Sequence, residues 1–305
     1  MTVDETSSQQ ARVTDSSLLG RPIQPVLPRK SAATAEDGRG WLLAVPFTLL
    51  ALCLAGPLVA ISLTAFQRGA GGFAHALGEA IYLRAIERTV LLALIVTVIC
   101  LCLGLFYAVG LAVSPAWIKF ILFASLFATF WISLLVRTYG WILLLEPVGA
   151  LYWALHKMGL LHAPLTIFQT TPAMYPAMVA AMLPFMVLPI YRSLVGLDRN
   201  QIWAARSLGG RASLIMRRII LPELKGGVVA GSTLVFMISL GFFVTPRFLA
   251  GPENFTLSTV IDHEFERTYD FTAASAMGLG LLGGVLVLFL FAERLFKVSE
   301  NWERV

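Results

Sequence analysis

Residues 202–209 read IWAARSLG and residues 217–222 read RRIILP, inside a polar, basic stretch that occupies residues 198–227. Long apolar runs stand on both sides of this stretch. A plain connector between two such runs needs only a few polar residues and a turn. This one combines helical periodicity, small residues and positive charge, which favours a docking element for a soluble partner.

The apolar runs predict an all-α integral membrane protein. The chain is 57% hydrophobic and 13% charged, with a mean hydropathy of +0.78, whereas soluble domains carry about 25% charged residues. About 20 apolar residues cross the hydrocarbon core as a helix, which satisfies its own backbone hydrogen bonds there. Six transmembrane helices are expected, at residues 41–66, 86–113, 117–145, 174–195, 227–248 and 273–296. Pro184 and Pro189 predict a kink in the fourth.

Residues 1–40 differ from the rest of the chain. They are rich in Ser, Thr, Gln, Arg and Pro and lack apolar clusters, which predicts a disordered tail. Asp4 and Glu5 stand where a secretory signal needs basic residues, and no apolar core follows before Trp41. The first span is therefore expected to be a retained anchor.

Basic residues predict the orientation, because Lys and Arg mark the cytoplasmic side of a membrane protein. With six spans, both termini and the loop at residues 196–225 lie on the side that holds 16 of the 23 Lys and Arg residues. Both termini are therefore expected in the cytoplasm. These basic residues are not interleaved with aromatics in a soluble domain, so no nucleic-acid partner is expected.

The opposite side carries an acidic stretch at residues 249–272, with a net charge of −4. It is read either as an ordinary solvated loop or as a surface that attracts a cationic cargo or its carrier. The candidate residues for docking a binding protein are Asp262, Glu264, Glu266 and Asp270.

No cofactor, metal or catalytic constellation is expected. The three cysteines, Cys53, Cys100 and Cys102, lie in apolar runs and should pack as small hydrophobes. The four histidines have no metal-ligand spacing, and the sequence lacks a phosphate-binding Walker loop.

The loop itself is expected to form two short helices. In a helix over residues 200–210, Ala205 and Gly209 share a face that admits a closely approaching partner, and Trp203 is a large anchor on a neighbouring face. Gly209 and Gly210 should end this helix. A second helix, over residues 212–220, is expected to stop at Pro222.

This loop resembles the EAA loop of permease subunits of binding-protein-dependent ABC importers. That pattern is Glu-Ala-Ala, a Gly four residues beyond the last Ala, and Ile-x-Leu-Pro ten residues further on. The matching positions are Ala204, Ala205, Gly209, Ile219, Leu221 and Pro222. Trp203 departs from the pattern because it replaces the Glu, so packing or Arg206 must supply the missing contact.

The resemblance extends over residues 85–296, and three further segments resemble the spermidine/putrescine branch of that family. These segments are LVRTYGW at 135–141, LPFMVLP at 183–189 and GFFVTP at 241–246. Their aromatic residues either line a translocation path, where aromatic faces attract ammonium groups, or pack between helices and at the interface. The candidates for the path are Tyr139, Trp141, Phe242 and Phe243.

The resemblance implies a MetI-like bundle with cytoplasmic coupling helices in a bacterial inner membrane. Its partners would be the lipid bilayer, a second permease subunit, an ABC ATPase dimer that binds the ATP, and an extracytoplasmic solute-binding protein. The implied organisation is a tail at residues 1–40, a first transmembrane helix and external loop at 41–84, a permease domain at 85–296 with its coupling loop at 196–225, and a tail at 297–305.

Three alternatives remain open at this point. Related permeases carry opines or iron. A secondary transporter would need buried carboxylates, and the six spans hold almost no acidic residue away from their ends. An intramembrane enzyme would need paired reactive residues at membrane depth, which the spans do not show.

Overall fold

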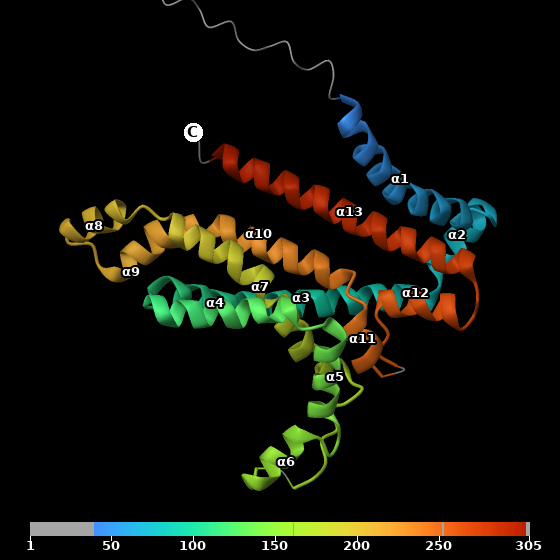
Figure 1. Cartoon of the computed structure of the whole chain (residues 1–305), viewed down its shortest axis with the longest axis horizontal. Helices are drawn as coiled ribbons and strands as arrows, with labels where there is room; N and C mark the ends of the chain where they lie inside the picture. The colour runs from blue at the N-terminus through green and yellow to red at the C-terminus, as the bar shows by residue number, and fades with distance from the viewer. Residues whose placement is uncertain (1–39, 161, 252, 303–305) are drawn as a thin grey trace, which may run out of the picture. The chain divides into compact units, whose positions relative to one another are not determined.

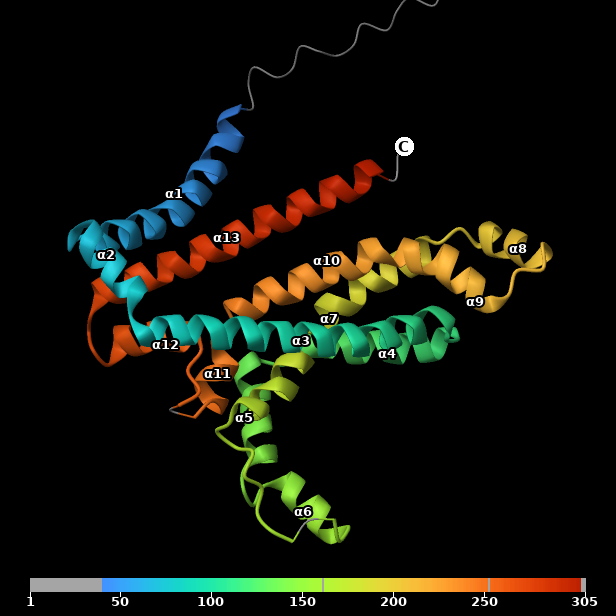
Figure 2. The same cartoon turned by 180° about the vertical axis from the view of Figure 1, so that it is seen from behind.

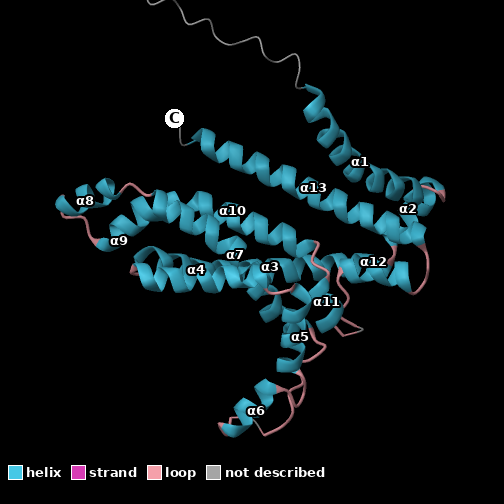
Figure 3. Cartoon of the chain, viewed as in Figure 1, coloured by secondary structure: helices cyan, strands magenta, loops and turns pink. Residues whose placement is uncertain are grey.

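The computed structural model describes residues 40–160, 162–251 and 253–302. The disorder predicted for residues 1–40 falls outside these ranges, apart from Gly40. The described chain is built of helices joined by turns and loops (Figure 3). The all-α prediction is therefore confirmed. The described chain divides after Gly56 into two units, and everything that follows on packing concerns the second.

Six helical segments of the described chain are long and apolar enough to cross a bilayer, which confirms the predicted number. The elements carry the labels of Figure 1. They are α1 (Gly40–Ala65), α2 (Gly69–Gly78), α3 (Ala80–Val113), α4 (Ala116–Trp131), α5 (Leu134–Leu145), α6 (Ala150–Lys157), α7 (Thr171–Gly196), α8 (Arg199–Ser207), α9 (Ala212–Ile215), the π-helical turn η2 (Met216–Ile220), α10 (Leu221–Leu240), α11 (Val244–Leu249), α12 (Leu257–Glu266) and α13 (Phe271–Trp302).

The third predicted span, at residues 117–145, is wrong as a single helix. The chain leaves the helical conformation at Ile132 and Ser133, which separate α4 from α5. This break frees carbonyl groups at the end of α4, and the Arg137 guanidinium donates to one of them, the Thr129 oxygen, at 2.9 Å. Arg137 is thus explained by a structural hydrogen bond. The apolar segment long enough to span begins at Leu134 and runs to Lys157.

The other spans differ from the prediction mainly at their ends. The second begins six residues earlier, at Ala80, and the connection predicted before it contains α2. The fifth ends at Leu240, because the chain turns at Gly241 before the separate helix α11. The helix of the sixth span continues to Trp302, into the predicted C-terminal tail. The fourth runs unbroken past Pro184 and Pro189.

The main core lies where α3, α7 and α10 pack together. Buried side chains recur every four residues along each helix, so ridges of the same i±4 type meet. On α7 the row is Met174, Met178, Met182, Met186 and Ile190, each at most 2% exposed. Methionine is unbranched and adapts to irregular gaps, which suits a row that faces two other helices.

Glycines on α3 and α10 set the separation of these helices. A Cβ atom on Gly104 would lie 2.7 Å from Met186 Cγ, and one on Gly231 would lie 3.0 Å from Met186 Sδ. At Gly227 it would lie 2.6 Å from the backbone oxygen of Pro189. Small residues let helix backbones approach closely in this way, and α10 is thereby fixed against α7.

A second, smaller core joins the first turns of α3 to α12 and α13. Its buried members are Tyr82, Ala85, Leu257, Val260 and Met277. Thr89 Oγ1 on α3 also accepts a buried hydrogen bond from the Leu257 amide at 2.8 Å, which satisfies a free N–H at the start of α12. In Figures 1 and 2 this end of α3 lies opposite the end that carries α8 and α9.

Replacing Gly227 with Ala should destabilise the protein, whereas the same change at its neighbour Gly226 should not. Gly226 has open space where a Cβ would stand, so Gly226→Ala should gain up to about 1 kcal/mol from helix propensity. Gly227→Ala forces α10 away from α7, and overpacking of this kind costs about 1–3 kcal/mol. Thermal unfolding of the two variants in detergent measures the difference. Equal stabilities would contradict the close packing of α7 and α10.

Candidate functional site

The loop between α7 and α10 lies at one end of the three-helix core (Figures 1 and 2). Asp198 starts its first helix, because Asp198 Oδ1 accepts a hydrogen bond from the Asn200 amide at 2.9 Å and so caps α8. The helix begins at Arg199 and ends at Ser207. The predicted helix over residues 200–210 therefore exists but is three residues shorter at its end.

The end of α8 is closed by a Schellman motif. The amide of Gly209 donates to the Arg206 oxygen at 2.9 Å, and the amide of Gly210 donates to the Ala205 oxygen, also at 2.9 Å. Gly209 has a φ of +76°, a left-handed conformation that costs a residue with a Cβ about 1–2 kcal/mol. A Cβ on Gly209 would itself meet open space. The glycine of the EAA pattern is thus required by the backbone within this chain.

The second helix does not stop at Pro222, so that prediction is wrong. The chain remains helical from α9 through η2 into α10, and Pro222 lies in the first turn of α10. A proline ring collides with the carbonyl four residues before it in a regular α-helix. The wider π turn, in which the Leu221 amide bonds to the Met216 oxygen, relieves this collision. The loop is thereby joined to α10 as one helical element.

The loop presents large apolar side chains to its surroundings. Trp203 is 66% exposed and Leu208 is 88% exposed. Ala204, Arg206, Gly209 and Leu221 are exposed as well, whereas Ala205, Ile219 and Pro222 are partly buried. Leu208 is not among the site residues predicted from the sequence. An apolar residue directly before the helix-ending glycine was the available signal.

The four aromatic residues predicted for a translocation path differ in their surroundings. Trp141 and Phe242 pack against the main core. The exposed ring of Tyr139 contacts Phe248, with ring centroids 5.6 Å apart. Among the described residues none of the four rings contacts another of the four. Phe248, which the sequence reading missed, is therefore the aromatic partner of Tyr139.

Part of the charge of the predicted acidic surface is neutralised by an arginine that stands just before it in the chain. Arg247 forms ion pairs with both Asp262 and Glu266. Glu264 accepts a hydrogen bond from the Thr268 hydroxyl at 2.6 Å. The net charge of −4 counted along the sequence therefore does not describe the charge that this surface presents.

Asp270, the fourth predicted docking residue, caps α13. Its Oδ1 accepts hydrogen bonds from the Thr272 and Ala273 amides, at 3.1 and 3.0 Å, and its Oδ2 accepts one from Arg68 at 2.6 Å. The Ala273 amide, and then Arg68, hold the pKa of the Asp270 carboxyl below its ordinary value. Asp270 therefore stays ionised at neutral pH and fastens α13 to the turn before α2.

The fold identifies the class of protein to which the chain belongs. A chain of a bacterial ABC transporter that imports the acidic polysaccharide alginate superposes with a TM-score of 0.69 at 18% identity, covering 84% of this chain and 95% of that one. A chain of the methionine ABC transporter MetNI gives a TM-score of 0.55 at 16% identity, over 71% of this chain and 94% of that one. The protein has the fold of the membrane subunits of ABC importers.

Sequence relatives give the family. The spermidine/putrescine transport system permease protein PotB of Salmonella typhimurium is 34% identical over 227 residues, which is 73% of this chain and 79% of that protein. PotB of Escherichia coli K12 is 32% identical over 74% of this chain and 83% of that protein. PotC of the same strain matches 70 residues at 40% identity. No family model matches. The chain belongs to the PotB family of ABC permease proteins, which confirms the resemblance seen in the sequence.

Replacing Gly209 should loosen the loop according to how well the new residue tolerates a positive φ. Gly209→Ala should speed amide hydrogen exchange across residues 205–215 about tenfold, because the left-handed conformation becomes strained. Gly209→Asn should change it much less, since Asn tolerates that conformation. Leu208→Ala, at a neighbouring position with a φ of −81°, is the control. Equal exchange in the Ala and Asn variants would contradict the backbone role.

Proposed function

We propose that this chain is one transmembrane subunit of an ATP-driven importer for spermidine, putrescine or a related amine, and that it forms half of the translocation pathway. The observation that carries the proposal is the 34% identity to PotB over 79% of that protein. The fold shared with the alginate and methionine transporters supports the transport mechanism, and the cargo class rests on the PotB names.

The proposed assembly contains a second permease, an ABC ATPase dimer and an extracytoplasmic solute-binding protein. The chain carries no Walker loop of its own, so ATP binding and hydrolysis are assigned to the partner subunit. The match to PotC supports a related second permease. We place the protein in the bacterial inner membrane with both termini in the cytoplasm, since basic residues concentrate on that side.

The coupling step follows from the continuity of the loop with α10. We propose that the ATPase binds α8 at Trp203, Ala204 and Ala205, and that Arg206 and Gly209 lie at the edge of this contact. Asp198 and the Schellman motif fix the two ends of α8, and the continuous helix through η2 transmits its movement to α10.

Movement of the loop is transmitted further because α10 packs closely against α7 at Gly227. It therefore tilts the core helices between inward-open and outward-open states. Ile219, Leu221 and Pro222 form the joint.

The path for the cargo is proposed to pass the aromatic residues that resemble the polyamine branch. Tyr139 and Phe243 keep rings accessible, at 54% and 36% exposure, and aromatic faces attract ammonium groups. Trp141 and Phe242 support them from the core side. Neutral aromatic faces would bind a polycation weakly enough to release it during transport.

The cargo can be identified in the reconstituted complex with its binding protein. Spermidine or putrescine should raise the ATPase rate several-fold, because loaded binding protein favours the state in which the ATPase dimer closes. Opines and ferric iron serve as controls with the same components. Stimulation by one of these, and none by amines, would overturn the polyamine assignment and leave the importer assignment intact.

Trp203 should carry much of the affinity for the ATPase. A buried aromatic anchor contributes about 2 kcal/mol or more to an interface, so Trp203→Ala should weaken ATPase binding roughly thirtyfold. Trp117→Ala is a matched control, because Trp117 is equally exposed, at 67%, but lies on α4. Affinities can be measured by titrating the purified ATPase onto the permease pair in nanodiscs.

The same titration, repeated at different salt concentrations, distinguishes an ATPase contact held by packing from one held by charge. Because Trp203 replaces the Glu of the EAA pattern, the affinity of the natural chain should change little between about 0.1 and 0.5 M salt. A steep loss of affinity with salt, or an unaffected Trp203→Ala variant, would contradict anchoring by packing.

A further inference from the structure

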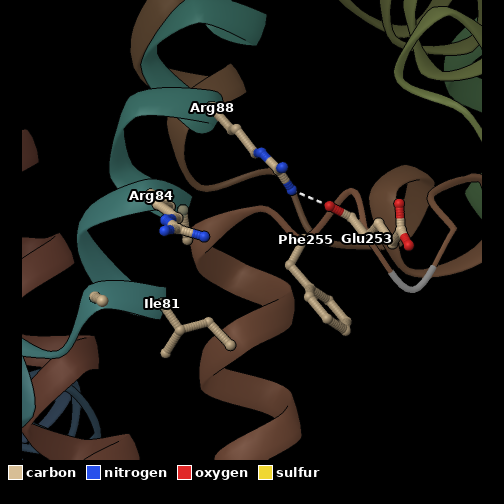
Figure 4. Close-up of a pocket in the computed structure, with 7 residues that line it drawn as sticks. Ile81, Arg84, Arg88, Glu253 and Phe255 are labelled. Atoms are coloured by element: carbon tan, nitrogen blue, oxygen red, sulfur yellow. Dashed lines mark hydrogen bonds between the residues drawn. The ribbon is translucent and has the colours of Figure 1, made fainter.

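Two arginines on the first turns of α3 border a hollow (Figure 4), at the end of α3 that contacts α12. Arg84 and Arg88 are four residues apart, so they lie on one face of the helix. The hollow has a volume of about 460 Å³. It is lined by Ala80, Ile81, Arg84, Ala85, Arg88, Glu253 and Phe255.

The positive charge of this hollow is not neutralised within the described part of the chain. Arg88 donates a hydrogen bond to the backbone oxygen of Glu253, a neutral group, and the carboxylate of Glu253 points away from both arginines (Figure 4). Neither arginine forms an ion pair with a described residue. Arg247 and Arg68, by contrast, are paired with acidic residues.

We propose that this arginine hollow receives acidic side chains of the solute-binding protein. The inference rests on the proposed function, which supplies such a partner on this side of the membrane. A guanidinium binds a carboxylate through two parallel hydrogen bonds, and the exposed side chains of Arg84 and Arg88 leave donors free for them. The contact orients the binding protein before it releases its cargo.

The cargo itself does not suit this hollow. An amine or polyamine is a cation, and two adjacent guanidinium groups repel it. The same repulsion has a use, because it keeps released cargo from resting beside the docking site. The charge of the two arginines thus selects an anionic partner and separates docking from transport.

The helix is long enough for the hollow to stand clear of the hydrocarbon region, which favours a protein partner over a lipid. Residues 90–113 of α3 form a helix about 36 Å long, which is enough to cross a hydrocarbon core of about 30 Å without Arg84 and Arg88. The opposite wall, at Glu253 and Phe255, belongs to a loop. Irregular backbone is not found facing lipid at that depth. Acidic side chains of an aqueous protein can therefore reach both arginines.

The test measures how much loaded binding protein is needed for half-maximal ATPase stimulation in nanodiscs containing both permeases and the ATPase. Arg84→Glu with Arg88→Glu should raise that concentration at least tenfold, since two charge pairs are lost and repulsion replaces them. Arg84→Glu alone keeps the Arg88 bond to Glu253 and should show a smaller increase. Lys157→Glu makes the same change of charge on α6, away from the hollow, and should have no effect.

Two further measurements test for direct charge pairing and for binding of a lipid instead. A substitution of one acidic surface residue of the binding protein by Lys should restore affinity toward the double variant, which a merely structural defect could not show. Nanodiscs of phosphatidylcholine alone are compared with nanodiscs that contain phosphatidylglycerol. An effect of the arginine variants only with the anionic lipid would assign the hollow to a lipid phosphate and overturn the proposal.

The outcomes also separate this inference from the proposed function. If the natural complex responds to loaded binding protein and the double variant responds equally well, the arginine hollow is not a docking site and the importer assignment stands. If the natural complex shows no response to any loaded binding protein, the result contradicts the proposed function itself. Loss of affinity without rescue by any acidic-to-Lys substitution counts against direct pairing.

Discussion

The close contact of α10 with α7 is the constraint on which the rest of the structure depends. Gly227 and Gly231 bring the α10 backbone against Pro189 and Met186, and the methionine row of α7 fills the space toward α3. In lipid there is no hydrophobic driving force between helices, so close packing must hold them together. The close fit at these glycines supplies that packing. A loop joined rigidly to α10 is then joined rigidly to the whole core.

The two ends of this core differ in which side chains remain exposed. At the end with α8 and α9 the backbone is specified in detail, by an Asp cap, a left-handed glycine and a π turn, while Trp203 and Leu208 remain exposed. At the other end Asp262, Glu266 and Asp270 form ion pairs that fasten α12 and α13, whereas Arg84 and Arg88 form none with a described residue. Each end thus leaves a different kind of side chain exposed.

Much of the fold followed from local sequence. The apolar runs located the spans, because hydrocarbon admits only self-satisfied helices, although the break after Trp131 escaped notice. A carbonyl freed by that break accepts a hydrogen bond from Arg137, a side-chain contact that hydropathy does not register. The resemblance of the loop to the EAA pattern was recognised from the spacing of six residues, and the end of its first helix at Gly209 was predicted correctly. The positive φ of Gly209 added the reason why the backbone requires a glycine there, whereas Pro222 was mistaken for a helix stop.

By itself the sequence determined the membrane class, the number of spans and the family, because length, hydropathy and motif spacing are properties of contiguous residues. Tertiary structure decided which charges remain free. Arg247 neutralises Asp262 and Glu266, and Arg68 reaches Asp270 from two hundred residues away, so the stretch that reads as acidic is not an open acidic surface. Arg84 and Arg88 become a site only because the loop at Glu253 and Phe255 folds against α3. Charge acts through space, and its partners are chosen by the packing of helices that lie far apart in the chain.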